Sequence, residues 1–218
     1  MRLSSERDYR WYDYAIMGLS QCIQALQKMP SVSPVRPSPA KTITEANLTV
    51  REQKQSAGLM RVNHSGEVCA QALYLGQQLT SRTPTLRDLF QQAAQEEEDH
   101  LAWCAQRLTE LNSHTSYLNP LWFGGAFFMG TAVGLISDRL NLSFLAETEK
   151  QVSAHLAQHL DILPANDEKS RAIVKQMQID ENKHASTALT HGGTDLPFLA
   201  QRIMHYTAKI MTNVAYYV

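Results

Sequence analysis

An all-α fold is predicted for this 218-residue chain from three features of its sequence. Alanine, leucine and glutamine are abundant, and these side chains lose little rotamer freedom in a helix. Runs in which Val, Ile or Thr alternate with polar residues, as in half-buried strands, are nearly absent. Long segments instead carry apolar residues at helical spacing. A chain of this length buries a sizeable core, so one main domain is expected.

Residues 1–47 are expected to lie outside that main domain. Within them, residues 5–29 repeat apolar side chains at helical spacing, which predicts an amphipathic helix. The following Pro- and Ser-rich stretch PSVSPVRPSPA (30–40) cannot continue a helix, because each proline lacks a backbone N–H and clashes with the preceding turn. It is predicted to be an extended linker. The main domain would then span residues 48–218.

The main domain is predicted to contain four long helices and a final apolar one. The expected ranges are 47–80, 84–112, 138–161, about 166–190 and 196–217. Pro84 suits a first helical turn, where its missing N–H would have no partner. Asn166 or Asp167 provides a capping side chain for the fourth helix, and the sequence HGGTD (191–195) ends it.

The stretch between the second and third of these helices is unlike the rest of the chain. Residues 111–137 contain no Asp, Glu, Lys or Arg, and LWFGGAFFMGTAVGLI (121–136) is almost wholly apolar. This run is short for a membrane span, which needs about 20 apolar residues. Its glycines would let another helix or a lipid chain approach the backbone closely. A buried central helix and a membrane-associating helix both stay open.

Two acidic motifs share the spacing Glu-x-x-His. Glu97 and His100 form the first pair, and Glu181 and His184 form the second. On a helix, residues three apart share one face with Cβ atoms about 5–6 Å apart, so each pair can bind one metal ion. A single pair would also fit a solvated helix face, where charged side chains are common.

Two further glutamates place these pairs in matching halves. Glu67 precedes the first pair by 30 residues, and Glu149 precedes the second by 32. About thirty residues is what one helix, a short turn and half of an antiparallel partner require. Each half is therefore expected to form a helical hairpin in which one glutamate faces one Glu–His pair.

Two such hairpins form a four-helix bundle with four glutamates and two histidines at its centre. Ferritin-like di-iron and di-manganese proteins use this ligand set. Four carboxylates balance the charge of two divalent ions, which makes their burial tolerable. Carboxylate and imidazole suit iron or manganese, and the absence of thiolates argues against structural zinc. The predicted metal ligands are Glu67, Glu97, His100, Glu149, Glu181 and His184.

Other residues near the ligands have predicted roles. Glu96 and Asp180 directly precede ligand glutamates, where each can accept the free ring N–H of the histidine from the opposite hairpin and fix its tautomer. Glu98 and Asp99 are expected to face water. Tyr74 lies two helical turns beyond the first ligand, so it either lines the pocket or belongs to the ordinary core.

Five motifs together resemble those of the demethoxyubiquinone hydroxylase family. They are RVNHSGEVCAQALY (61–74), EEEDH (96–100), NPLWFGGAFFMG (119–130), AETEKQVSAH (146–155) and DENKHA (180–185). The resemblance covers about residues 48–217. It implies a ferritin-like fold with two iron ions on the same six ligands. The implied activity is O₂-dependent hydroxylation of the ring of a polyprenylated demethoxyubiquinol in ubiquinone biosynthesis.

The resemblance also implies a place in the cell and a set of partners. The protein would be peripheral, on the cytoplasmic face of a bacterial cell membrane, with its apolar segment letting the polyprenyl tail remain in lipid. The glycines expected to line the groove for that tail are Gly124, Gly125, Gly130 and Gly134. Other ubiquinone-biosynthesis proteins are implied partners. No GxGxxG or flavin signature is present, so NADH, a separate reductase and the quinol itself stay open as electron donor.

Composition argues against several other classes. A net charge of −1 gives no basis for binding nucleic acid. Three cysteines without CxxC spacing argue against a disulfide framework, and the N-terminus has no apolar core of the secretory type. Two alternatives stay open. One is a soluble ferritin-like oxidase or di-manganese catalase with the same ligands, and the other is a non-enzymatic helical membrane adaptor.

Overall fold

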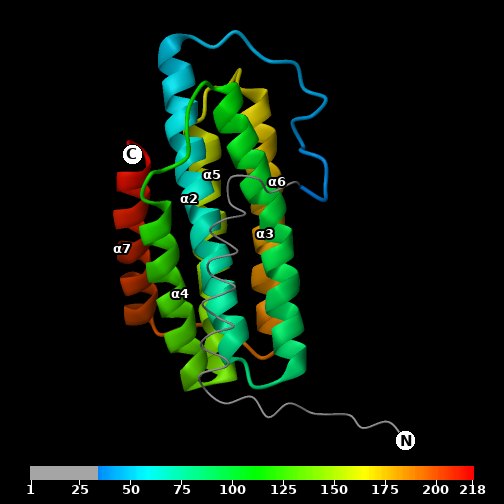
Figure 1. Ribbon diagram of the computed structural model, residues 1–218, viewed down its shortest axis with the longest axis vertical. Helices are drawn as coiled ribbons and strands as arrows, with labels where there is room; N and C mark the ends of the chain where they lie inside the picture. The colour runs from blue at the N-terminus through cyan, green and yellow to red at the C-terminus, as the bar shows by residue number, and fades with distance from the viewer. Residues whose placement is uncertain (1–33) are drawn as a thin grey trace, which may run out of the picture.

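The computed structural model describes residues 34–218, and within this range the chain is helical without strands, as predicted. The helices are α2 (Val50–Thr80), α3 (Pro84–Glu110), α4 (Asn119–Ile136), α5 (Asp138–Ile162), α6 (Glu168–Thr190) and α7 (Phe198–Ala215) (Figure 1). The helix predicted over residues 5–29 lies outside the described residues, as does the start of the predicted linker. Residues 34–49 are described and precede the first bundle helix without being helical themselves.

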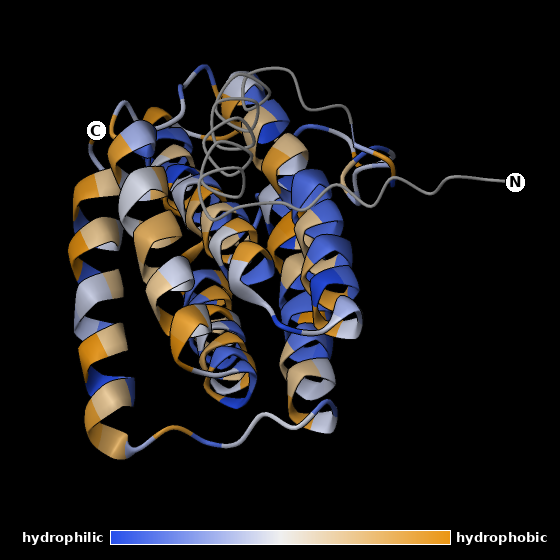
Figure 2. Cartoon of the chain, turned by 60° about the horizontal axis from the view of Figure 1, so that its bottom comes forward, coloured by the Kyte–Doolittle hydropathy of each residue, from blue (hydrophilic) through white to orange (hydrophobic). Residues whose placement is uncertain are grey.

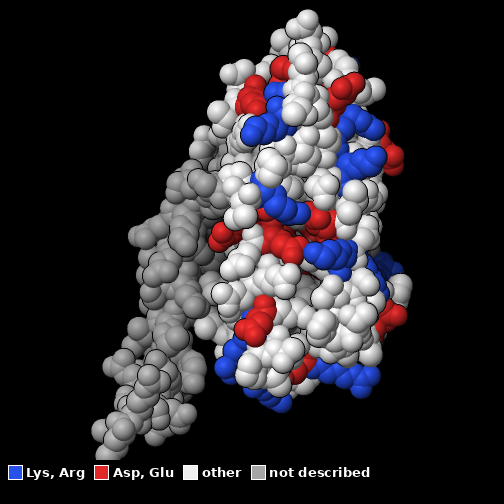
Figure 3. Space-filling model, turned by 90° about the vertical axis from the view of Figure 1, so that its right-hand side faces the viewer, with Lys and Arg blue, Asp and Glu red and all other residues white. Residues whose placement is uncertain are grey.

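Four of these helices form the predicted bundle. α2 packs along α3, and α5 packs along α6, so each half of the sequence forms one antiparallel hairpin. The two hairpins meet through contacts of α2 with α5 and of α3 with α6. α4 and α7 lie side by side outside the bundle (Figures 1 and 2). Groups of charged side chains lie on the face on the other side, where α3 and α6 lie (Figure 3).

Side-chain caps determine where the bundle helices begin. The Thr49 hydroxyl accepts a hydrogen bond from the backbone N–H of Glu52, whose carboxylate in turn accepts one from the Thr49 N–H, which makes a capping box. The caps of α3, α5 and α6 each accept from a backbone N–H of the first turn; they are Thr83, Ser137 and Asp167. Of the two caps considered for the fourth bundle helix, Asp167 is therefore the one used.

Two apolar clusters fill the two ends of the bundle. One contains Met60, Trp103, Leu108, Leu156, Ile173 and Met177. The other contains Tyr74, Phe90, Leu142, Leu145 and Ala188. The middle of all four helices, between these clusters, is left for buried polar side chains, which the apolar ends shield from water.

α4 lies on the surface of the bundle, so its interpretation as a buried central helix is wrong. It is the one described helix that is long and apolar enough to cross a membrane, yet only 28% of its 18 residues are buried. Its buried residues are Asn119, Phe123, Ala126, Gly130 and Gly134, which lie on one face. That face packs on α2, and the rest of the helix faces outward.

The four glycines of α4 fall into two groups. A Cβ atom at Gly130 would collide with the Leu73 backbone, and one at Gly134 would collide with the Thr80 hydroxyl, both on α2. Beside Gly124 and Gly125 there is open space. A tail groove along all four glycines, as expected from the sequence, is therefore not what the structure has, because α2 fills the space next to the second pair.

Candidate metal centre

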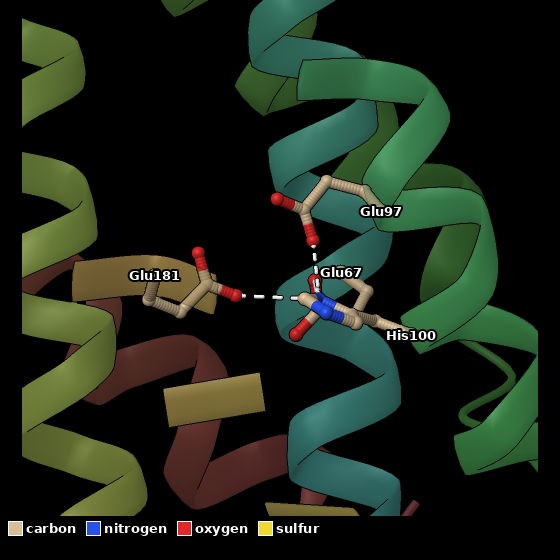
Figure 4. Close-up of side chains that lie close together, drawn as sticks. All are labelled: Glu67, Glu97, His100 and Glu181. Atoms are coloured by element: carbon tan, nitrogen blue, oxygen red, sulfur yellow. Dashed lines mark hydrogen bonds and ion pairs between the residues drawn. The ribbon is translucent and has the colours of Figure 1, made fainter. Parts of the chain in front are cut away.

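The six predicted ligands meet at the middle of the bundle, between the two apolar clusters. α2 contributes Glu67, α3 contributes Glu97 and His100, α5 contributes Glu149, and α6 contributes Glu181 and His184. All six side chains are buried. Their oxygen and nitrogen atoms form two groups, and within each group they lie within 4.8 Å of one another. The first group, Glu67, Glu97, His100 and Glu181, is shown in Figure 4; the second is Glu97, Glu149, Glu181 and His184.

Glu97 and Glu181 belong to both groups. One carboxylate oxygen of Glu97 lies 2.7 Å from His100 Nδ1, and the other lies 3.1 Å from His184 Nδ1. Glu181 likewise places one oxygen 3.4 Å from Nδ1 of each histidine. A carboxylate with one oxygen toward each half suits a bridge between two ions. The remaining two glutamates each belong to one group, so the cluster offers two adjacent positions with two shared ligands.

Each histidine turns its other ring nitrogen outward, to a carboxylate of the opposite hairpin. His100 Nε2 lies 3.0 Å from Asp180 Oδ2, and His184 Nε2 lies 3.0 Å from Glu96 Oε2. An Nε2–H that donates to a carboxylate leaves Nδ1 to bind a metal ion. The structure thus brings Asp180 and Glu96 to the positions expected of them from the sequence.

In the metal-free cluster, the contacts among the ligands shift the pKa values of the carboxylates and of His184. Burial, reinforced by neighbouring carboxylates, raises the pKa of Glu67 and Glu149 well above the usual value. Burial opposes the charged form of His184, but the carboxylates of Glu181 and Glu97 close to its Nδ1 outweigh this and raise its pKa to about 12. The metal-free centre therefore holds protons in places where divalent ions would supply positive charge instead.

Unpaired polar atoms at the centre indicate that the residues fit metal ions. Among the described residues, Oε1 of Glu97, both carboxylate oxygens of Glu181 and Nδ1 of His184 are buried and make no well-directed hydrogen bond, although they lie 3.1–3.4 Å from a group of opposite charge. A buried polar atom without a partner costs about 1–3 kcal/mol, so such atoms are uncommon. These atoms belong to residues of the two ligand groups, and Glu97 and Glu181 are members of both. Carboxylate oxygens with imidazole nitrogens suit iron or manganese.

Tyr74 lies both at the site and in the apolar core, so the structure combines the two interpretations of this residue. Its hydroxyl group donates a hydrogen bond to Oε1 of Glu149. The ring is buried and packs near Phe90, at 6.5 Å between centroids, so the residue also belongs to the apolar cluster. Spacing along α2 was the signal that identified Tyr74 as a candidate.

Asp99 corrects an expectation from the sequence, because it does not face water. Its side chain is buried and accepts hydrogen bonds from Arg36 Nε at 2.6 Å and from the Val35 N–H at 2.6 Å. Arg36 also donates to Asp180 at 2.9 Å, so it touches an outer carboxylate of the centre. No motif pointed to Arg36, since residues 1–47 were expected to lie outside the main domain.

A four-helix bundle with two Glu-x-x-His pairs and two further central glutamates defines the ferritin-like class of carboxylate dimetal proteins. Comparison with known proteins narrows this class. Residues 54–215 match the family described as Ubiquinone biosynthesis protein COQ7. The chain therefore belongs to the COQ7 family, which confirms the family predicted from its motifs.

Relatives of this chain share their name across organisms. A protein of Coxiella burnetii is 49% identical over 215 residues, which cover 99% of both chains. A protein of Acinetobacter baumannii is 51% identical over 212 residues, covering 97% of this chain and 99% of the relative. Both relatives are named 3-demethoxyubiquinol 3-hydroxylase.

Proposed function

We propose that this protein is a di-iron monooxygenase that hydroxylates the ring of a polyprenylated demethoxyubiquinol with O₂, a late step of ubiquinone biosynthesis. The observation that carries the proposal is the pair of overlapping ligand groups at the buried centre of the bundle. The names of the relatives support the substrate class. The carboxylate-rich donor set supports iron.

The residues of the chain would hold and orient the reacting groups. Glu97 and Glu181, which belong to both ligand groups, would help to hold both ions, and each of the other four ligands would help to hold one. Bound iron supplies the activation of O₂. Asp180 and Glu96 hold the histidine rings through their Nε2–H groups, and the apolar clusters keep water from the centre.

The reaction also needs an electron donor. One oxygen atom of O₂ enters a ring C–H bond as a hydroxyl group, and the other leaves as water. Balance requires two electrons and two protons from a donor. NADH, a separate reductase and the quinol itself are the donors to compare, by omitting each in turn from the reconstituted reaction.

An apolar face on α4 and α7 supports a peripheral position on a membrane. Its exposed residues are Leu121, Phe128, Leu135 and Ile136 on α4, and Phe198, Leu199, Ile203, Tyr206 and Ile210 on α7. The two helices form neighbouring hydrophobic columns in Figure 2. An exposed apolar surface shared by two helices is typical of membrane or partner contact. The proposed location is the cytoplasmic face of a bacterial cell membrane, with the tail of the substrate in lipid near Gly124 and Gly125.

Reconstitution tests the proposed reaction directly. The protein is loaded with Fe(II) without oxygen, then mixed with reduced demethoxyubiquinol, a reductant and isotopically labelled O₂. Mass analysis of the quinone should show one labelled oxygen atom in the ring. Loss of O₂ without labelled product, or decomposition of peroxide by a manganese-loaded protein, would indicate the oxidase or catalase class instead.

Substitution of one histidine tests the ligand assignment. His184→Ala should lower bound iron toward half and abolish hydroxylation, because it removes the imidazole of one half of the centre. His191→Ala is the matched control, since His191 is exposed just beyond the same helix. Iron content by elemental analysis and product by mass spectrometry are measured for both. Full iron content together with full activity in His184→Ala would refute the assignment.

A further inference from the structure

The segment before the bundle, residues 34–37, passes the outer side of the candidate metal centre and is called the strap below. The chain from residue 34 to α2 runs beside α3 and α6 (Figure 1). On this side of the molecule acidic side chains gather near the middle, with basic side chains close to them (Figure 3). Arg36 is the basic residue of the strap.

Arg36 is held by contacts of both its backbone and its side chain. Its Nε donates to Asp99 Oδ2 at 2.6 Å, and its Nη1 donates to Asp180 Oδ2 at 2.9 Å. The backbone N–H groups of Val35 and Arg36 donate to Asp99 Oδ1 at 2.6 and 3.2 Å. The Arg36 carbonyl accepts from Trp103 Nε1 at 3.2 Å, and the guanidinium carbon lies 5.0 Å from the centroid of that ring. The strap is therefore attached to the bundle at several points.

These contacts continue to a candidate ligand. Asp180 Oδ2, which accepts from Arg36, also lies 3.0 Å from His100 Nε2. Gln176 donates to the other Asp180 oxygen at 3.0 Å, so both oxygens of this carboxylate are held. The Trp103 ring that packs on Arg36 also lies 5.4 Å from the His100 ring, between centroids. The strap thus contacts two side chains that orient His100.

Within residues 34–218, the other half of the centre has no comparable support. Glu96, which faces His184 Nε2, is paired with Lys183 at 3.4 Å, and the Lys183 side chain is 63% exposed. Gln92 donates to Glu96 at 3.3 Å. Among residues 34–218, no arginine makes a hydrogen bond or an ion pair with Glu96. An exposed lysine pair contributes little, because solvent screens it and the long side chain is flexible.

We propose that Arg36 is a positioning residue of the metal centre. It holds Asp180 as the acceptor of the His100 Nε2–H, and so strengthens metal binding in the half that contains His100. The inference rests on the proposed dimetal function. Arginine suits this role because its guanidinium stays charged and its rigid fork can bind two carboxylates at once. Here the fork joins Asp99 of α3 to Asp180 of α6, across the two hairpins.

The test compares Arg36→Gln with Lys41→Gln, which removes the same charge from an exposed residue close by in the chain. Both full-length proteins are titrated with Fe(II) without oxygen, and Mössbauer spectra are recorded at full loading. Loss of an outer hydrogen-bond partner weakens metal binding about 10–100-fold. In Arg36→Gln one binding step should therefore weaken about tenfold, and the signal of one iron should shift. Lys41→Gln should match the wild type.

Arg36→Lys provides a second, milder variant. It keeps the charge but cannot bind two carboxylates as a fork, so its affinity should lie between those of the wild type and Arg36→Gln, with the same iron affected. It also carries the test if Arg36→Gln fails to fold. If both variants have the same binding steps and spectra as the wild type, the role of Arg36 is refuted while the proposed function still stands. Failure of the wild type to bind iron would overturn the proposed function instead.

Discussion

At the scale of single residues, protonation of Glu67 and Glu149 reduces the negative charge of the four buried ligand carboxylates. Because their pKa values are raised by burial and by neighbouring carboxylates, they hold protons in the metal-free protein. The protons also explain how the centre is tolerated before metal arrives, since unpaired buried charges would be far more costly. Metal ions must displace these protons, so binding and pH are linked.

The stability of the metal-free protein is expected to fall as pH rises. A group with a raised folded pKa stabilises the fold below its unfolded pKa and loses that contribution as pH rises through the folded value. Glu67, Glu149 and His184 all act in this direction, and above about pH 7 the buried histidines with lowered pKa values, His64, His155 and His159, no longer oppose it. The lowered pKa values of Glu97 and Glu181 stabilise the fold above the ordinary carboxylate pKa, and this contribution changes with pH only below that value.

Urea unfolding between about pH 7 and 9 measures this effect, because the ordinary carboxylate and histidine pKa values lie below that window. Added Mn(II) should remove the fall, since it replaces the protons. Glu149→Gln, which resembles the protonated side chain, should flatten the slope in the metal-free protein. A metal-free protein whose stability is independent of pH would contradict the expectation.

At the scale of helices, the contact between α2 and α4 depends on glycines from both. A Cβ at Gly76 of α2 would lie 2.5 Å from the Phe127 carbonyl oxygen, and a Cβ at Gly130 of α4 would meet the Leu73 backbone. The two helices approach closely because neither carries a side chain at these points. α4 is thereby held firmly on the bundle while its other face remains exposed.

Alanine substitutions in α4 should separate its two kinds of glycine. Gly130→Ala is expected to destabilise the fold by about 1–3 kcal/mol, because the new methyl group overpacks the contact with α2. Gly124→Ala is the matched control and should stabilise by about 0.5–1 kcal/mol, since its surroundings are open and alanine favours the helix. Unfolding free energies in urea provide the measurement. Equal effects of the two substitutions would contradict this account of the helix contact.

At the scale of the whole molecule, two opposite sides differ in chemistry. α4 and α7 present apolar residues outward, while the face with α3 and α6 has groups of acidic and basic side chains (Figures 2 and 3). The bundle between them holds the candidate centre. In the proposed membrane position, this division would place the apolar side against lipid and the charged side in water.

Membrane binding should therefore depend on the apolar face. Ile203→Glu removes a 59% exposed side chain from α7, and burial of such a side chain contributes about 1.5–3 kcal/mol. Partition into phosphatidylethanolamine and phosphatidylglycerol vesicles should fall by about tenfold or more. Ile162→Glu changes a similarly exposed isoleucine, at 51%, that lies outside this face and serves as control. Equal flotation of both variants with the wild type would argue against the proposed orientation.

The sequence by itself determined the helical class, the two matched hairpins and the set of six residues at the centre. These follow from local rules. Residues three apart share a helix face, and residues about thirty apart lie opposite each other on two antiparallel helices joined by a short turn. Capping residues such as Asp167 likewise act on their own first turn. The same rules brought Glu96 and Asp180 into consideration, since each adjoins a ligand.

Only the tertiary structure decided which faces are covered. It buries Asp99, which a local pattern placed in water, and it sets Gly130 and Gly134 against α2 rather than in an open groove. It also brings Arg36 to Asp99 and Asp180, which lie 63 and 144 positions away in the chain. Contacts over such separations depend on how helices pack against one another, and helical periodicity records only which residues share a face, not what lies opposite that face.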